Sequence, residues 1–156
     1  MNVNAQSFFE PSDSLNKRRY IGLAATDVLG TAGSLLALNE VWYKQYPRSS
    51  FHLFDDNAEW LQMDKVGHTL TAYYIGYANV RAMDWAGLPR KKAIWWGTMG
   101  LVYQTGLELL DGFSTNWGFS VGDMIANAAG TGILIGQEYA WNEQRVLVKY
   151  SAHLTE

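Results

Sequence analysis

Three polar signatures, each at the end of an otherwise apolar helical segment, constrain this chain more than any other feature of its sequence. They are Asp64-Lys65-x-x-His68, Glu108-x-x-Asp111-Gly112 and Gly118-Phe119-Ser120-x-x-Asp123-x-x-x-Asn127. If the segments run alternately up and down, all three signatures meet at one end of a bundle. Ionisable groups beside an apolar core are costly unless they are paired or used. We therefore expect the functional site at that end.

Four stretches have the length and composition of helices, and none shows the alternation of a strand. The predicted helices cover residues 19–46, 64–86, 90–111 and 121–141. We predict an all-α fold, a four-helix up-and-down bundle over residues 19–142 of a single domain. Residues 1–18 form a flexible lead-in, whose first residues match either a signal-peptide remnant or a disordered N-terminus. Residues 143–156 are expected to be a polar tail that is cut short.

The apolar segments leave two environments open. The first helix is almost uncharged from Tyr20 to Asn39, which is the length of about 20 residues that spans a bilayer. The charge-free cores of the other three helices are shorter, and the overall hydropathy is slightly polar, as in a soluble bundle. Aromatic residues at both ends of the helices and recurring small residues favour a membrane-embedded or membrane-associated bundle. The lipid bilayer is then the first expected partner.

Basic residues are concentrated at the end opposite the signatures. That end holds Lys17, Arg18, Arg19, Arg81, Arg90, Lys91, Lys92, Arg145 and Lys149, and the signature end holds Lys44, Arg48 and Lys65. In an inner membrane this bias puts the polar cluster in the periplasm. The signal-peptide interpretation instead fits a protein at the periplasmic side of the outer membrane. The prediction is a bacterial cell-envelope protein, with the choice between the two membranes open.

Several function classes lack their sequence requirements. The net charge of -3 offers no electrostatic case for nucleic acid, and neither a P-loop nor a glycine-rich dinucleotide turn is present. Without cysteine the chain has no thiol nucleophile, disulfide or thiolate metal site. The HExxH and GxSxG motifs are also missing, and Ser120 has no nucleophile context.

The first signature places Asp64 and His68 on one helical face, because they are four residues apart. The carboxylate could orient the imidazole for acid–base chemistry, or the pair could bind a metal. Alternatively, Asp64 is the N-cap of the second helix and His68 is a hydrogen-bonded packing residue.

Glu108 in the second signature is the strongest candidate for a functional side chain. With Asp111 it lies at a helix C-terminus, where the helix dipole disfavours acids. Gly112 is expected to end that helix in the left-handed conformation. A carboxylate beside apolar residues is costly unless it is paired or takes up a proton, and a salt bridge from Glu108 to Lys65 is the alternative.

In the third signature, Ser120 and Asp123 match a capping box that opens the fourth helix, with Ser120 as the N-cap. Asn127 follows one turn later and needs a hydrogen-bond partner inside the apolar run. Together, the acids and the single histidine suit Mg²⁺, Ca²⁺ or Mn²⁺ better than zinc. The candidate ligands are Asp64, His68, Glu108, Asp111 and Asp123. A structural network without metal is the alternative.

The order and spacing of the three signatures, continued to Gly130, resemble the YfiM-like family of predicted periplasmic lipoproteins, and more distantly the VanZ-like membrane proteins. The resemblance covers about residues 63–138. It implies an envelope location and a compact helical domain, but no activity. This chain departs from the lipoprotein pattern in having no cysteine, so embedding through the first helix would replace a lipid anchor.

Three functional hypotheses remain. One is a small-molecule or ion-binding module, which needs the same polar cluster around a cavity without activating groups, and the other two differ more sharply. The first is a non-catalytic envelope accessory or scaffold, whose polar helix ends form a structural or docking site for an envelope protein complex. The second is a hydrolase-like membrane enzyme acting on a lipid-linked or cell-wall substrate. In that enzyme Glu108 is the general base, and His68 is the acid or a metal ligand. Carboxylates and His68 converging on one shared atom or ion would favour the second.

Overall fold

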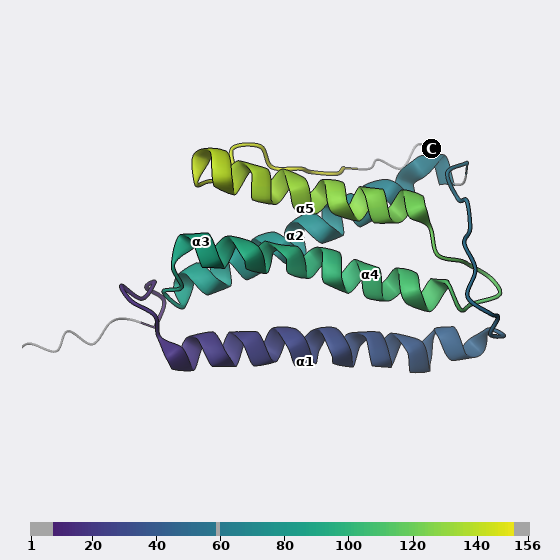
Figure 1. The fold of residues 1–156 in the computed structure, drawn as a ribbon, viewed down its shortest axis with the longest axis horizontal. Helices are drawn as coiled ribbons and strands as arrows, with labels where there is room; N and C mark the ends of the chain where they lie inside the picture. The colour runs from purple at the N-terminus through teal and green to yellow at the C-terminus, as the bar shows by residue number, and fades with distance from the viewer. Residues whose placement is uncertain (1–7, 59, 152–156) are drawn as a thin grey trace, which may run out of the picture.

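The helices run alternately up and down, so successive helix ends fall at opposite ends of the bundle (Figure 1). The computed structural model describes residues 8–58 and 60–151. Its α-helices are α1 (Lys17–Val41), α2 (Met63–Trp85), α3 (Arg90–Ala93), α4 (Met99–Asp111) and α5 (Val121–Trp141). No strand occurs among these residues, which confirms the all-α prediction. The predicted signal-peptide remnant at residues 1–7 and the last residues of the tail, 152–156, lie outside the described residues.

The third predicted helix is not one continuous α-helix. Between α3 and α4, residues Ile94–Thr98 wind as a tighter 3₁₀ helix. Here the backbone lies directly against α2, because a Cβ at Gly76 would collide with the carbonyl oxygen of Gly97. The prediction of an uninterrupted α-helix over residues 90–111 is therefore wrong at this contact.

Small residues set the spacing between α2 and its neighbours. A Cβ at Gly100 would meet the backbone of Ala72, and one at Gly130 would meet the backbone of Thr69. Close backbone approach leaves room for only a small apolar core. Its centre is Tyr73, Val80 and Leu134, with Tyr77 and Val148 packed against it.

The segment after α5 folds back along the bundle. Gln137 anchors it, since its Oε1 accepts hydrogen bonds from the backbone of Arg145 (3.0 Å) and Val146 (2.7 Å). The Gln144 side chain bonds to Tyr73 and Gln137. Residues 144–148 therefore form part of the packed structure.

A second polar group closes the end of the bundle opposite the signatures. Arg90 forms ion pairs with the fully buried Glu138 and, at 2.6 Å, with Asp84. Gln144 Nε2 donates to Glu138 Oε1 at 2.7 Å. Because Glu138 has this cation and this donor, its burial does not leave an uncompensated charge.

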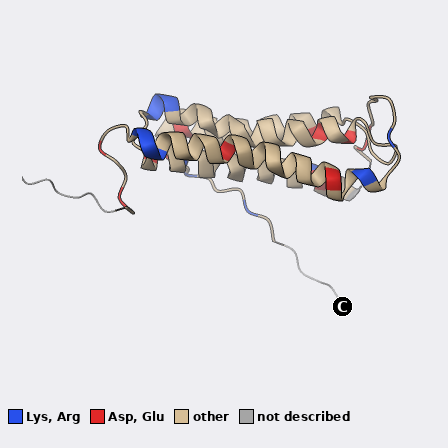
Figure 2. Cartoon of the chain, turned by 90° about the horizontal axis from the view of Figure 1, so that it is seen from below, with Lys and Arg blue, Asp and Glu red and all other residues tan. Residues whose placement is uncertain are grey.

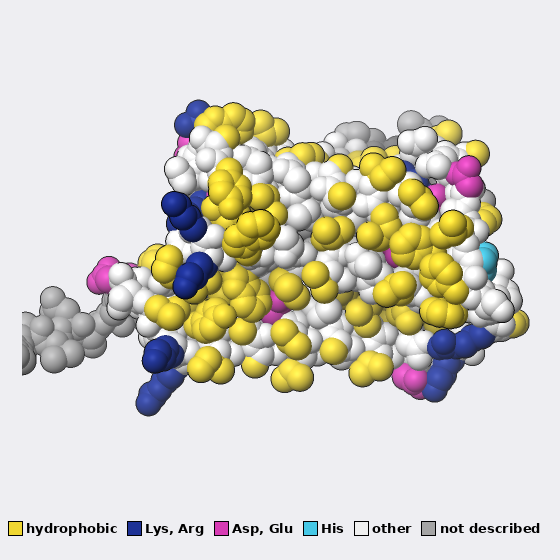
Figure 3. All heavy atoms as spheres, in the orientation of Figure 1, with side chains coloured by type: hydrophobic (Ala, Val, Ile, Leu, Met, Phe, Trp, Pro, Cys, Tyr) yellow, Lys and Arg dark blue, Asp and Glu magenta, His cyan; other side chains and the backbone are white. Residues whose placement is uncertain are grey.

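The distribution of apolar residues is partly inverted relative to a soluble protein. α1 contains no buried residue, and five of its large apolar side chains are more than half exposed. They are Ile21, Val28, Leu29, Leu36 and Val41. Hydrophobic side chains cover much of the face shown in Figure 3, and the helical shafts are nearly free of charge between their ends in Figure 2. Among the described residues, one stretch, Lys17–Gln45, is long and apolar enough to cross a membrane.

The buried residues, by contrast, include many polar ones. They are Gln104, Glu108, Ser114, Ser120, Asp123, Asn127, Thr131, Gln137 and Glu138. Most belong to the polar groups at the two ends of the bundle. The fold therefore buries polar side chains beside its small apolar core and leaves many large apolar side chains exposed.

Candidate functional site

The three signatures meet at one end of the bundle, which we call the signature end. The start of α2, the end of α4 and the start of α5 all lie there (Figure 1). Direct contacts join them, since His68 on α2 lies 3.6 Å from Glu108 on α4 and 3.1 Å from Asn127 on α5. The side chains form two groups with different degrees of hydrogen bonding.

The Lys65 group consists of Lys65, Asp56, Ser120 and Asp123. Lys65 Nζ lies 2.6 Å from Asp56 Oδ1 and 2.8 Å from Asp123 Oδ1. The Ser120 hydroxyl donates to Asp56 at 2.8 Å and accepts from the backbone N–H of Asp123 at 3.1 Å. Ser120 is thus the N-cap of α5, as predicted. This closed network ties a loop and two helices together.

Hydrogen bonds and opposite charges outweigh the effect of burial on the pKa values of Lys65 and Asp56. Burial alone would lower the pKa of Lys65, but hydrogen bonds to Asp123 and Asp56 raise it. Burial would raise the pKa of Asp56, but Lys65 and Ser120 hold it below its ordinary value. Lys65 therefore stays protonated and acts as the structural cation of the site.

The His68 group consists of His68, Asp64, Glu108, Asn127 and Gln104. His68 Nδ1 lies 3.1 Å from both Asn127 Oδ1 and Gln104 Nε2. Its other nitrogen, Nε2, lies 3.6 Å from Asp64 Oδ1 and 3.6 Å from Glu108 Oε1. These two distances are too long for hydrogen bonds. The imidazole is therefore positioned through Nδ1, and its Nε2 has no hydrogen-bond partner among the described residues.

Glu108 is 1% exposed, and its Oε2 accepts a hydrogen bond from the backbone N–H of Ser120 at 2.9 Å. Burial raises the pKa of Glu108 to about 8, and the nearby carboxylates of Asp123, Asp111 and Asp56 add to that effect against the Ser120 bond. At neutral pH without other ligands, Glu108 therefore carries a proton most of the time.

Asp111 is stabilised by a residue outside the three signatures. The Tyr43 hydroxyl donates to Asp111 Oδ1 at 2.6 Å. Burial raises the pKa of Asp111 to about 6 in spite of this hydrogen bond. With Glu108, it leaves the cleft with more acid groups than Lys65 alone can neutralise.

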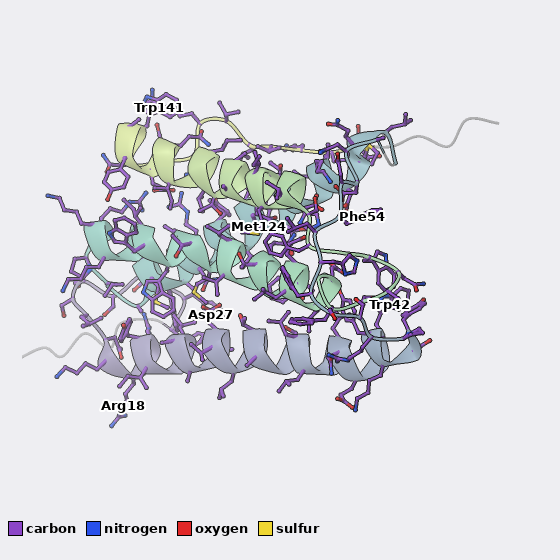
Figure 4. All side chains as sticks on the ribbon, turned by 45° about the vertical axis from the view of Figure 1, so that its right-hand side comes forward. Arg18, Asp27, Trp42, Phe54, Met124 and Trp141 are labelled. Atoms are coloured by element: carbon purple, nitrogen blue, oxygen red, sulfur yellow. The ribbon has the colours of Figure 1, made fainter. Side chains whose placement is uncertain are left out.

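A cleft of about 620 Å³ opens onto the His68 group. Its lining residues are Trp42, Phe54, Asp56, Met63, Asp64, His68, Glu108, Asp111, Asn116, Trp117, Gly118 and Asp123. Trp42 and Phe54 lie at this end in Figure 4, and Arg18 and Trp141 lie at the other. An aromatic rim above an acidic floor suits a cation or a ligand with both polar and apolar parts.

Backbone pairing between two loops positions the cleft. The N–H of His52 bonds to the carbonyl of Gly112, and the N–H of Phe54 bonds to that of Phe119, each at 3.0 Å. A Cβ at Gly112 would lie 2.5 Å from the Phe51 ring. Glycine is needed there for space, because Gly112 has a right-handed φ of -57°. The predicted left-handed conformation is wrong.

Two of the simpler alternatives for the signatures are also wrong. The N-cap of α2 is Gln62 in a left-handed conformation, so Asp64 is in the first turn and is not the cap. Lys65 pairs with Asp56 and Asp123, so it does not form the salt bridge considered for Glu108. The functional roles predicted for Asp64, His68, Glu108, Asp111 and Asp123 stay predictions.

Three residues of the site were not among the sequence candidates. Asp56 lies in a loop that reads as an exposed connection, Gln104 lies one turn before Glu108 on α4, and Tyr43 follows α1. The i, i+4 spacing from Gln104 to Glu108 was a usable signal. No local pattern marks Asp56 or Tyr43.

A metal could be held where the two groups meet. One ligand atom each from Asp64, His68 and Asp123 lie within 4.8 Å of one another. Glu108 adds a further carboxylate beside His68. The same set could shuttle a proton, because it combines an imidazole with a carboxyl whose pKa lies near neutrality.

A family model described as "Predicted periplasmic lipoprotein (DUF2279)" matches residues 52–135, more than half of the chain. The match begins in the loop that carries Asp56 and ends within α5, so it contains the Lys65 and His68 groups. It confirms the predicted resemblance to a periplasmic lipoprotein family and gives no support to the VanZ-like one. No curated protein and no solved structure matches the chain.

Proposed function

Because this chain belongs to the DUF2279 family of predicted periplasmic lipoproteins, we propose that it is a non-catalytic protein seated in a bilayer of the cell envelope. It acts as an accessory that presents the signature-end cleft to the periplasm as a binding site. The observation that carries the proposal is the contrast between the exposed apolar surface of α1 and the polar cleft at one end.

The energetics of α1 support the bilayer seat. Five large apolar side chains on this helix are more than half exposed, and burying each would stabilise the protein by roughly 1 to 2 kcal/mol. Exposed apolar surface of this extent is unusual for a soluble monomer. Asp27, the only charge between Tyr20 and Asn39, is turned toward Asn79 on α2, as expected for an acid within a membrane protein.

Arrangement of charge supports the orientation. Lys and Arg are concentrated at the end opposite the cleft, which suits the cytoplasmic side of an inner membrane. Trp42, Tyr46 and Trp117 contact one another at the cleft end. Aromatic side chains of this kind prefer the boundary between lipid and water.

Single cysteines test the bilayer seat directly, because the chain has no native cysteine. Val28→Cys lies on the exposed surface of α1, and Ser50→Cys lies in the exposed loop at the cleft end. In vesicles of phosphatidylethanolamine and phosphatidylglycerol we expect a charged maleimide to label position 50 and not position 28. Position 28 should react once detergent and denaturant unfold the protein. Equal labelling of both in intact vesicles would refute the proposal.

The non-catalytic role rests on the ion pairs and hydrogen bonds of the Lys65 group, which join a loop to two helices, and on the lack of an activated nucleophile among the described residues. Its test is Glu108→Gln, which keeps the shape of the side chain. Purified protein is incubated with phosphoester, carboxyl-ester and glycoside reporters. We expect no turnover that depends on Glu108. Turnover that Glu108→Gln abolishes, at a melting temperature no lower than that of the wild type, would contradict the proposal.

One observation favours an enzyme as the second candidate. Glu108, with a pKa of about 8, faces His68 at 3.6 Å across an open cleft. A carboxylic acid that stays protonated near neutrality can act as a general acid and then as a base. A hydrolase-like enzyme acting on a lipid-linked or cell-wall substrate would use this pair, and the reporter experiment separates it from the accessory.

A further inference from the structure

We propose that the cleft binds one divalent cation of the Mg²⁺ and Mn²⁺ class through His68 Nε2 and carboxylate oxygens of Asp64 and Asp123. Glu108 lies beside the ion as a further oxygen ligand. This names the ligand of the cleft and so rests on the binding role proposed above.

The tautomer of His68 supports the first ligand. If Nδ1 carries the ring proton, it donates to Asn127 Oδ1 at 3.1 Å. Gln104 also lies 3.1 Å from Nδ1, and its own Oε1 is buried without a partner among the described residues. Because the two ends of an amide are assigned from their hydrogen bonds, a half-turn of the Gln104 amide brings that oxygen to the same N–H. In that tautomer both amide oxygens accept from the Nδ1 N–H and Nε2 is free to bind a metal, while Asn127 Nδ2 stays buried without a partner among the described residues.

The lone pair of Nε2 consequently points toward carboxylate oxygens. It lies 3.6 Å from Asp64 Oδ1 and 3.6 Å from Glu108 Oε1. The electron pairs of Nε2 and of the Asp64 carboxylate, which face each other, repel unless a positive centre lies between them. A hydrogen bond needs a shorter distance, whereas two ligands each about 2.1 Å from one ion are about 3 to 3.5 Å apart. The spacing therefore fits a shared cation better than a shared proton.

Glu108 gives an independent indication of a ligand. The residue is 1% exposed and its Oε2 is satisfied by the Ser120 backbone. Its Oε1 lines the cleft, and no donor within the described part of the chain reaches it. A carboxylate oxygen that faces a cleft and accepts no hydrogen bond is suited to bind a cation.

Net charge around the cleft favours uptake of a cation. Lys65 offsets one negative charge of the pair formed by Asp56 and Asp123. Asp64 Oδ2 lies 4.0 Å from the same Lys65 Nζ, and Asp111 forms no ion pair with a lysine or arginine among the described residues. The Asn127 and Gln104 contacts give the imidazole the outer hydrogen bonds that metal-binding histidines have.

Ligand chemistry selects the class of ion. One imidazole among carboxylates is a poor set for Ca²⁺, which prefers six to eight oxygens. A single histidine is also fewer than catalytic zinc sites normally use. Mn²⁺ accepts both carboxylate and imidazole and is the best probe of this site.

The experiment measures Mn²⁺ binding to the full chain in detergent by calorimetry and by pulsed electron paramagnetic resonance. We expect one Mn²⁺ per chain, with hyperfine coupling to one imidazole nitrogen. Asp64→Asn should weaken binding about 10-fold or more, since even outer-shell changes cost about that much. Asp64 is half exposed, so this variant keeps the fold. His68→Gln should abolish the nitrogen coupling.

The matched control is Glu40→Gln, which removes one acid at the same end from an exposed pair with Lys44. Its affinity should stay within about twofold, because separated surface charges are screened. The absence of saturable binding, the absence of nitrogen coupling, or equal losses in Asp64→Asn and Glu40→Gln would overturn the proposal. The cysteine-labelling result does not depend on metal, so a failed cation site and a failed bilayer seat give different patterns.

Discussion

Glu108→Gln should make this protein more stable, and increasingly so as the pH rises. Burial gives Glu108 a pKa of about 8 in the folded state, against its ordinary value of 4.5. The unfolded chain releases the proton near pH 4.5 and the folded chain holds it until about pH 8. Between these values the folded state binds more protons, so the wild type loses stability as the pH increases. The amide of a glutamine does not ionise, so the variant does not lose stability in this way.

The size of the effect follows from the two pKa values. At about 1.4 kcal/mol for each pH unit, the wild type should lose about 3 to 4 kcal/mol relative to Glu108→Gln between pH 5 and pH 8. The Gln carbonyl can still accept the hydrogen bond from the Ser120 backbone, which is 2.9 Å long in the wild type. The difference between the proteins therefore isolates the ionisation of residue 108.

The assay is urea unfolding in a mild detergent at half-unit steps from pH 5 to pH 8, with a chelator present so that no cation stabilises the carboxylate. Asp111 titrates in both proteins, and its repulsion of an ionised Glu108 is part of the difference that the comparison measures. Glu143→Gln, an exposed carboxylate beside Arg145, is the control and should run parallel to the wild type. The reasoning is refuted if the Glu108→Gln and wild-type curves are parallel, or if the wild type gains on the variant as the pH rises.

Substitutions at paired and packed positions test the rest of the structure. Lys65→Met leaves the buried Asp123 and the partly buried Asp56 without their cation and should cost about 3 kcal/mol of unfolding free energy. Exposed Lys44→Met should cost less than about 1 kcal/mol. Equal losses in urea unfolding would contradict the structural role. Gly130→Val should cost about 2 kcal/mol or more by pushing two backbones apart, while Gly132→Ala, facing open space, should be neutral or stabilising. Gln144→Ala should expose residues 143–151 to limited proteolysis without loss of helicity, and unchanged cleavage would show that this side chain does not hold them.

Much of the helical architecture is predictable from local sequence chemistry. Ser120 caps α5, and that helix spans residues 121–141 as predicted, because a hydroxyl before an apolar run satisfies free backbone N–H groups. The meeting of the three signatures also follows from helix order alone, since antiparallel neighbours put the start of α2 and the end of α4 together.

Predictions from local sequence fail where a segment distant in sequence packs closely against the helix. Gly112 reads as a left-handed helix stop, but its hydrogen atom in place of a side chain makes room for Phe51. Residues 94–98 read as α-helix, but the contact between Gly76 and Gly97 holds them in a tighter winding. Neither neighbour is visible within a helical window of the sequence.

The sequence by itself determined which residues of the helices can carry chemistry, because their spacing of three and four places them on shared faces at helix ends. Only the tertiary structure decided how those residues are paired. Backbone pairing of residues 52–54 with the loop before α5 carries Asp56 to Lys65, and this leaves His68 and Glu108 facing an open cleft. Which carboxylates lie close enough to share a cation depends on long-range packing, and helix periodicity does not encode that packing.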